Sequence, residues 1–256
     1  MTFPALATSL LIAFSSAPLL AHAADADTHH HPHWSYQGEE SPLHWGELSA
    51  EYADCSRGKN QSPVDFTEAE GTQGGRLHLQ YKPTRFSVIN NGHTIQATPA
   101  DGVQSLQIGT KQFRLRQFHF HTPSEHTFKG KHFPMEVHLV HQSDEGELAV
   151  LGAVFKEGPA NPALTGLLAQ PVLPGKRVHL NTPLKLEDLL PKSSIHFRLN
   201  GSLTTPPCSE GVNWVVFSSP VPASAQQIEA MHKMIGQDNA RPIQPLNARI
   251  IIQEDN

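Results

Sequence analysis

The residues of this 256-residue chain best suited to chemistry lie between Gln117 and His141, where twenty-five positions hold six of the 17 histidines. Neutral imidazole is a common metal ligand. Three imidazoles around one open coordination position are the donor set of a catalytic zinc ion, because a water molecule in the open position loses a proton readily. The stretch therefore predicts a zinc site, provided that three of its histidines converge.

Two alternating runs indicate which histidines converge. The first covers residues 116–121, where polar and aromatic side chains alternate. Successive side chains of a strand point to opposite faces of its sheet. Gln117, His119 and His121 therefore share one face, while the two phenylalanines between them point into the opposite layer.

The second run covers residues 135–141 and places Glu136, His138 and Val140 on one face. Turn-forming residues separate the two runs, namely Pro123, Gly130 and Pro134. If the two strands pair, His138 joins the two histidines of the first run.

The metal ligands predicted in this way are His119, His121 and His138. On each strand a polar residue, Gln117 or Glu136, stands two positions before a histidine and can accept a hydrogen bond that orients an imidazole ring. A polar, histidine-rich hairpin without a metal is the alternative, since His-x-His on a strand is only a moderate metal signal.

Motifs spread along the chain match one known family. They are Trp34-Ser35-Tyr36, Gln61 to Asp65, Asn90 to His93, Gln117 to His121, Ser124-Glu125-His126, Glu136 to His141, Gly201 to Trp214, Arg241-Pro242 and Gln244 to Leu246. In this combination the chain closely resembles the alpha-class carbonic anhydrases, from about Trp34 to Arg249. The resemblance implies a zinc lyase that hydrates carbon dioxide reversibly to bicarbonate and a proton by zinc-hydroxide attack, with a histidine proton shuttle.

The resemblance also implies three catalytic residues. Thr204 matches the family threonine whose hydroxyl accepts a hydrogen bond from the metal-bound hydroxide and donates one to a carboxylate, here Glu125. An ionised carboxylate only accepts, so the Thr204 proton is directed to Glu125. His93 stands at the position of the proton shuttle, a task suited to an imidazole. Without the resemblance, residues 204–207 read as a rigid turn and His93 as a turn histidine.

Substrate and solvent contacts are implied for a further set of residues. Carbon dioxide is small and apolar, so it requires an apolar wall and no charged clamp. By resemblance the wall consists of Val140, Val150, Leu203, Val212 and Trp214, each of which alone would read as core packing. Thr205 would contact bicarbonate, and Tyr36, Asn91 and Gln96 would organise water, although packing explains Tyr36 equally well. Sulfonamides and anions are expected inhibitors.

Residues 1–23 read as a secretory signal peptide. An apolar run from Ala5 to Leu20 precedes Ala21-His22-Ala23, which has the small-x-small form of a cleavage site. The run contains serine and proline and makes a poor membrane span. We expect a periplasmic or secreted protein without a membrane span after signal removal; a retained anchor and an unusual cytosolic N-terminus are the alternatives.

The chain has two cysteines, Cys55 and Cys208, more than 150 residues apart. Related bacterial carbonic anhydrases carry cysteines at similar places, so the resemblance implies that the two form a disulfide, as export would favour. The bridge would brace the loop that begins at Thr204. Two buried free thiols are the alternative.

Composition favours one globular domain, since the chain is 38% apolar and has no obvious linker, and the resemblance implies that residues 34–256 form the alpha-carbonic anhydrase domain. Residues 24–33 are a His-rich segment, read as a solvated tail, with zinc capture as an alternative. The net charge of −5 with scattered basic residues argues against nucleic acid as a partner. A homodimer is left open.

Short alternating runs separated by turn residues predict hairpins. The runs are 77–81, 86–89, 94–97, 105–108 and 113–116, with buried-looking strands at 147–155 and 212–217. Asn161-Pro162 starts one helix, and Ser224 with Gln227 forms a capping box for another that ends at Gly236. The expected fold is mainly β, a single domain around a large twisted, mostly antiparallel central sheet with a few short peripheral helices. Residues 34–64 read as an ordered loop region.

Two functions of other classes compete with the enzyme. A binding module with the same fold would have lost zinc chemistry, but such proteins typically lack a metal histidine, and this chain has all three. A zinc reservoir centred on the His-rich segment would bind several exchangeable metal ions and would not hydrate carbon dioxide.

Overall fold

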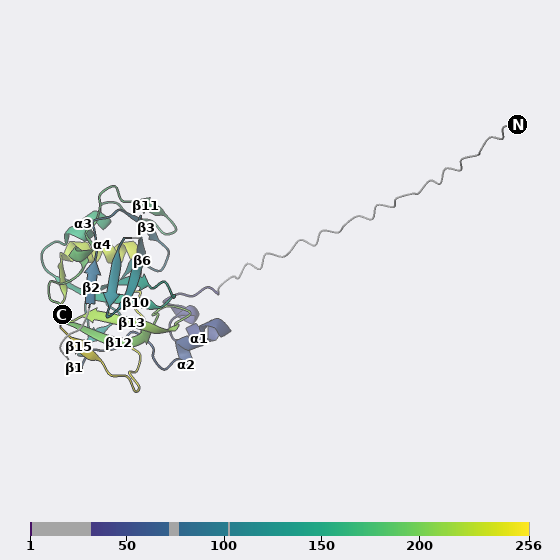
Figure 1. The fold of residues 1–256 in the computed structure, drawn as a ribbon. Helices are drawn as coiled ribbons and strands as arrows, with labels where there is room; N and C mark the ends of the chain where they lie inside the picture. Colours follow the sequence, from purple (N-terminus) through teal and green to yellow (C-terminus); the bar gives the residue numbers. More distant parts are fainter. Residues whose placement is uncertain (2–31, 72–76, 102, 256) are drawn as a thin grey trace. The chain divides into compact units, whose positions relative to one another are not determined.

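A sheet of 13 strands forms the body of the described chain (Figure 1). The structure, a computed structural model, describes Met1 and residues 32–71, 77–101 and 103–255. The expected signal peptide and the His-rich segment up to His31 lie outside the described residues. Within the described residues, no helix is long and apolar enough to cross a membrane.

The strands follow the alternation of the sequence, as in β3, where buried and half-buried residues alternate. In the large sheet they are β1 (Glu70–Gly71), β2 (Leu77–Gln80), β3 (Phe86–Asn90), β4 (Ile95–Pro99), β5 (Ser105–Ile108), β6 (Lys111–His121), β9 (Met135–Gln142), β10 (Leu148–Glu157), β11 (Arg177–His179), β12 (His196–Ser202), β13 (Glu210–Phe217), β14 (Val221–Ala223) and β15 (Ile252–Glu254). A separate two-stranded sheet consists of β7 (Thr127–Phe128) and β8 (Lys131–His132). The main path runs β1-β15-β12-β13-β10-β9-β6-β4-β3-β11, with β2, β5 and β14 joined beside it.

The prediction of a mostly antiparallel sheet is confirmed, with exceptions. β10 pairs in parallel with β13 and β14, and β1 pairs in parallel with β15. Hairpin turns join strands that are neighbours in the sequence, so they predict antiparallel pairs only. Residues 158–209 separate β10 from β13, and a connection of this length allows the chain to cross over and pair the two strands in parallel. The sheet is consequently mixed.

The two runs expected at 113–116 and 116–121 form one strand, β6, of 11 residues. A register irregularity between Leu115 and Gln117 interrupts its pairing with β9. Such a bulge adds a residue to one strand and re-aims the side chains beyond it. The histidine-bearing half of β6 keeps the predicted alternation.

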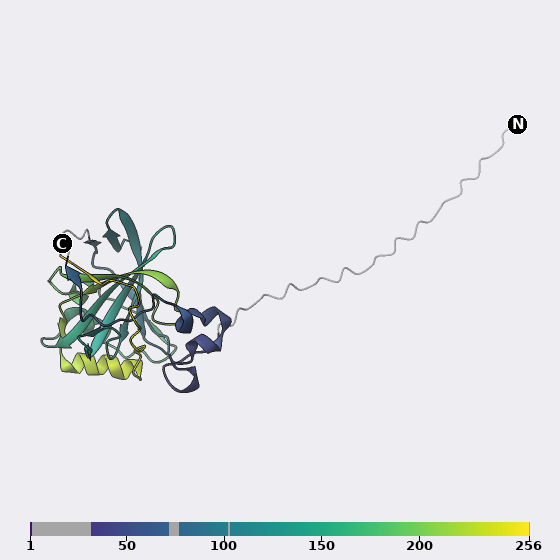
Figure 2. The ribbon, with the colours of Figure 1, turned by 90° about the horizontal axis from the view of Figure 1, so that it is seen from below.

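Both predicted helices are present. α3 (Pro162–Leu167) begins after Asn161, whose side chain accepts hydrogen bonds from the amides of Ala163 and Leu164. α4 (Ala225–Ile235) begins with the expected capping box of Ser224 and Gln227 and ends at Gly236, which has a φ of 86°. Figure 2 shows α4 alongside the sheet, into whose core it buries Met231 and Ile235.

Short helical turns were missed within the expected loop region of residues 34–64. They are η1 (Gly38–Glu40), α1 (Trp45–Leu48), η2 (Ala50–Tyr52) and α2 (Asp54–Arg57); η3 (Leu186–Leu189) lies later in the chain. Each spans about one turn, so no apolar repeat marks it in the sequence. Trp45 and Tyr52 are buried by these turns.

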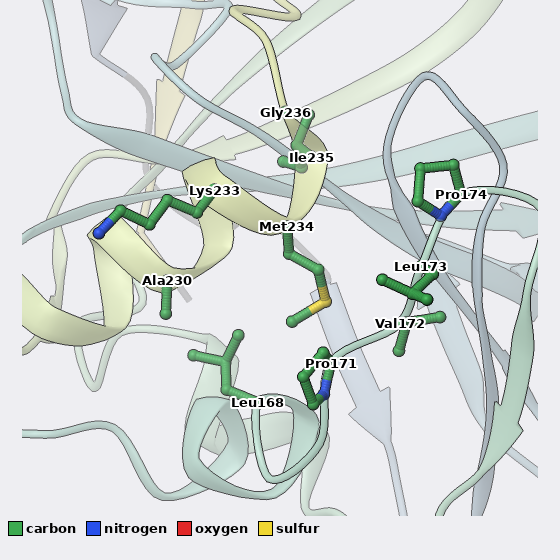
Figure 3. Close-up of a pocket in the computed structure, with 10 residues that line it drawn as sticks. All are labelled: Leu168, Pro171, Val172, Leu173, Pro174, Ala230, Lys233, Met234, Ile235 and Gly236. Atoms are coloured by element: carbon green, nitrogen blue, oxygen red, sulfur yellow. The ribbon is translucent and has the colours of Figure 1, made fainter.

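A cavity of about 420 Å³ lies between the C-terminal end of α4 and residues 168–174 (Figure 3). Its lining is apolar apart from Lys233, and the side chain of Met234 extends into it. The amide Nδ2 of the buried Asn90 donates to Val172 O at 3.2 Å and to Met234 O at 2.7 Å, which joins the two walls. None of the histidines of the predicted metal site lines this cavity.

His141 is buried in the core and is not one of the three histidines that converge. Its Nδ1 donates to Leu139 O at 2.9 Å, so Nε2 accepts from the Tyr81 hydroxyl at 2.8 Å. Burial lowers the pKa of His141 from 6.5 to about 4. The imidazole is therefore neutral in the folded protein at neutral pH.

This histidine predicts acid sensitivity of the fold. The unfolded chain binds the proton below about pH 6.5 and the folded chain only near pH 4, so the free energy of unfolding should fall by about 3 kcal/mol across that window. Urea titrations at several pH values measure the fall. The double variant Tyr81→Phe/His141→Leu should show a shallower pH dependence than the wild type; parallel curves would contradict the prediction.

Candidate metal centre

Pairing of β6 with β9 brings the three predicted ligands together. His119 lies opposite His138, and His121 lies opposite Glu136. One imidazole nitrogen from each of the three histidines lies within 4.8 Å of the others. A tetrahedral zinc ion holds its nitrogen ligands about 3.4 Å apart, given Zn–N bonds of about 2.0–2.1 Å. A small movement of the rings is enough to close the site.

Hydrogen bonds determine which nitrogens of His119 and His138 are free. His119 Nδ1 lies 2.8 Å from Gln117 Oε1, and His138 Nε2 lies 2.9 Å from Glu136 Oε1. Each oxygen can only accept, so these nitrogens carry the protons. The lone pairs on His119 Nε2 and His138 Nδ1 remain for a metal. Gln117 and Glu136 thus occupy the orienting positions predicted for them.

His121 is oriented by a residue that was not predicted. Its Nδ1 donates to the main-chain oxygen of Asn239 at 2.8 Å. Its Nε2 is buried and has no hydrogen-bond partner in the described part of the chain. An unpartnered buried nitrogen is unfavourable unless something binds it. This nitrogen and the free nitrogens of His119 and His138 form a set of three donors that fits zinc well.

The Glu136 carboxylate is the centre of a buried network. Its Oε2 accepts from the main-chain amides of Glu125 and His126, and its Oε1 accepts from the rings of His126 and His138, all within 2.9 Å. Burial alone would raise the pKa of Glu136, but the two imidazoles hold it well below its usual value. Gly152 leaves room here, since a Cβ would lie 3.1 Å from Oε1. His126 thus supports Glu136 through both its ring and its amide.

The ligand histidines differ in proton affinity. Burial, followed by repulsion from the neighbouring imidazoles, lowers the pKa of His119 well below 6.5, and burial lowers the pKa of His121. Burial also acts to lower the pKa of His138, but the charge and hydrogen bond of Glu136 raise it overall. Two of the three ligands are therefore neutral at pH 7 without assistance.

Glu125 lies at the site, but it makes no hydrogen bond with its predicted partner. The amide of Arg241 donates to Glu125 Oε1 at 2.9 Å. Oε2 has no hydrogen-bond partner within the described residues and lies 3.5 Å from His121 Nε2 and 3.8 Å from His138 Nδ1. The hydrogen bond expected from the buried Thr204 is therefore not formed, because Oε2 faces the ligand nitrogens instead.

The five residues expected to form an apolar wall lie together in one hydrophobic cluster. Three are buried, Val150, Val212 and Trp214, and the partly buried Val140 and Leu203 pack against this cluster. Val150 pairs with Val140 on one side and with Trp214 on the other. The Trp214 ring lies 4.8 Å from the His138 ring, measured between centroids. The wall thus adjoins the ligand set.

His93 is half-buried on the turn between β3 and β4. Its ring stacks on Trp34 at 3.8 Å and makes no side-chain hydrogen bond within the described residues. Its amide donates to Asn91 Oδ1 at 2.9 Å, and its carbonyl accepts from Asn239 Nδ2 at 3.0 Å. Burial, followed by the charge of His33, lowers the pKa of His93. The Asn91 side-chain oxygen thus holds the turn that carries His93.

The remaining predicted polar residues lie around these elements. Tyr36 packs edge-on against Trp34 and Trp45, in line with the packing interpretation, and burial raises its pKa well above the usual value. Gln96 pairs with His119 across β4 and β6. Thr205 is half-buried, and its carbonyl accepts from the Cys208 amide at 2.9 Å.

A disulfide joins Cys55 to Cys208. The buried Arg241 donates to the Cys55 carbonyl at 2.8 Å and to Gln61 Oε1 at 2.9 Å. Because its own amide binds Glu125, Arg241 connects the disulfide region to the ligand set. The sequence showed Arg241 only as part of a motif, and Asn239 carried no local signal, since its main chain makes the contact.

Comparison with known proteins agrees with this geometry. The family model for eukaryotic-type carbonic anhydrase matches residues 40–255. A carbonic anhydrase of Pectobacterium atrosepticum is 43% identical over 240 residues, covering 93% of this chain and 98% of the relative. A carbonic anhydrase of Neisseria gonorrhoeae is 42% identical over 253 residues, covering 98% of each. The solved alpha-carbonic anhydrase of Thermovibrio ammonificans, in complex with the inhibitor sulfanilamide, has a TM-score of 0.83 at 45% identity, over 87% of this chain and 99% of that one.

Proposed function

The chain belongs to the eukaryotic-type, or alpha, carbonic anhydrase family, and from this we propose that it hydrates carbon dioxide with a zinc ion held by His119, His121 and His138. The observation that carries the proposal is the convergence of three imidazole nitrogens within 4.8 Å. The other nitrogen of each ring donates to an oxygen, which presents three lone pairs to one point.

A bound zinc ion would supply the Lewis acidity that makes a water molecule nucleophilic at neutral pH. The apolar cluster around Val150 and Trp214 would receive carbon dioxide without competing for that water. Thr204 would orient the attacking water once Glu125 Oε2 turns to accept the threonine proton. Thr205 would contact bicarbonate.

Stopped-flow hydration of carbon dioxide on the purified protein tests this function. We expect rapid turnover, its loss after zinc is removed by a chelator, and its return when one equivalent of zinc is added. A protein that takes up several exchangeable zinc ions and shows no hydration would instead be a zinc reservoir.

His93 is the proposed proton shuttle. Its ring is half-buried, and its Nδ1 makes no hydrogen bond to the described residues, so no such contact fixes a proton on that nitrogen. In weak buffer, His93→Ala should lower kcat by about 10²-fold and leave kcat/KM unchanged, since the proton leaves after the substrate is converted. Added imidazole should restore kcat. Full turnover of the variant in weak buffer at unchanged zinc content would refute the assignment.

Export and inhibition are proposed with the function. The disulfide supports a periplasmic or secreted protein, because such bonds persist in oxidising compartments. The sulfanilamide complex of the Thermovibrio relative supports inhibition by sulfonamides here, and inhibition by anions stays a prediction. Signal cleavage after Ala23 and a homodimer stay predictions.

A further inference from the structure

A second histidine lies beside His93 at the edge of the described chain. The His33 ring centroid is 6.5 Å from that of His93. His33 Nδ1 lies 2.9 Å from Glu40 Oε2, and the two side chains are 74% and 45% exposed. His33 and Glu40 thus extend from the half-buried His93 to solvent.

Hydrogen bonds hold this segment in place on both sides of His33. The Tyr52 hydroxyl donates to the Pro32 carbonyl at 3.0 Å. The indole of the buried Trp45 donates to the carbonyls of Ser35 at 2.9 Å and Glu40 at 3.0 Å. Since Trp34 also stacks on His93, His33 has a defined position relative to the shuttle ring.

We propose that His33 is the outer station of the proton path, receiving a proton from His93 and releasing it to Glu40 or to buffer. The proposal rests on the hydration function above. Two imidazoles in direct hydrogen bond have centroids about 5 Å apart, so the 6.5 Å separation is of the size that one intervening water molecule would span. An N–H bond of His93 breaks, the water gains one proton and loses another, and an N–H bond of His33 forms; no electrons are transferred.

Exposure and charge both favour this direction of transfer. His93 is half-buried against Trp34, whereas His33 is open to buffer molecules. Among the described residues, the titratable groups facing the two rings are Glu40, Tyr36 and the two imidazoles themselves. His33 Nδ1 lies within hydrogen-bond distance of the Glu40 carboxylate, while burial, followed by repulsion from His33, lowers the pKa of His93 and so favours release of its proton.

The test compares His33→Gln with a matched control, His44→Gln. His44 is also exposed and lies 3.6 Å from a carboxylate, Glu47, without contacting His93. In a low concentration of a bulky buffer, His33→Gln should lower kcat at least about threefold while kcat/KM and zinc content stay unchanged. Glu40→Gln should act in the same direction, His44→Gln should have no effect, and added imidazole should restore kcat.

A second measurement is independent of turnover. NMR titration of the zinc-loaded protein should give a raised pKa for His93 in His33→Gln but not in His44→Gln, because the repulsion is removed. Equal kcat values for His33→Gln and the wild type, or a loss that imidazole does not restore, would overturn the relay. A wild type without any hydration activity would instead refute the proposed function.

Discussion

Replacing His121 with Ala is expected to remove most of the bound zinc and nearly all hydration activity. Two imidazoles and a buried cavity would remain where three nitrogens converge. Since the metal contributes several kcal/mol to the stabilisation of the transition state, we expect a loss in kcat/KM of about 10³-fold or more. Zinc content by mass spectrometry and stopped-flow rates measure the two effects.

The exposed His78 on β2 provides the control. His78→Ala removes an imidazole far from the ligand cluster in sequence and should leave zinc content and rate unchanged. Stoichiometric zinc and a normal rate in His121→Ala would mean that the ion binds elsewhere.

The Glu136→Gln variant should lose both stability and metal affinity. The carboxylate accepts four hydrogen bonds, whereas an amide has one oxygen and adds a donor, so some of the four donors must lose their acceptor. Leaving buried polar groups unpaired should lower the free energy of unfolding by about 3 kcal/mol or more. Because the His138 ring would no longer be held in one orientation, zinc binding should weaken about 10–100-fold.

Urea unfolding and chelator competition measure these losses. Glu147→Gln is the matched control, because Glu147 forms an exposed ion pair with Lys111. Such pairs contribute about 1 kcal/mol or less, so this variant should be close to wild type in both assays. Near-identical behaviour of the two variants would argue against the buried network as the support of the site.

The sequence by itself determined the features that arise between near neighbours in the chain. Alternation placed Gln117, His119 and His121 on one face of β6, because a strand repeats every two residues. Capping rules located α3 and α4, because the first amides of a helix need acceptors from the preceding residues. The residues that orient His119 and His138 followed as well, since an acceptor two positions before a histidine shares its face.

Only the tertiary structure decided the contacts between distant segments. The Asn239 carbonyl that orients His121 is 118 residues away, and it acts through the main chain, which every residue type possesses. The parallel pairing of β10 with β13 and the free Glu125 oxygen are likewise consequences of packing. His33 lies near His93 because Trp45 and Tyr52 hold the segment that carries His33 in place. No local pattern encodes such contacts, because they depend on how the whole chain closes around its core.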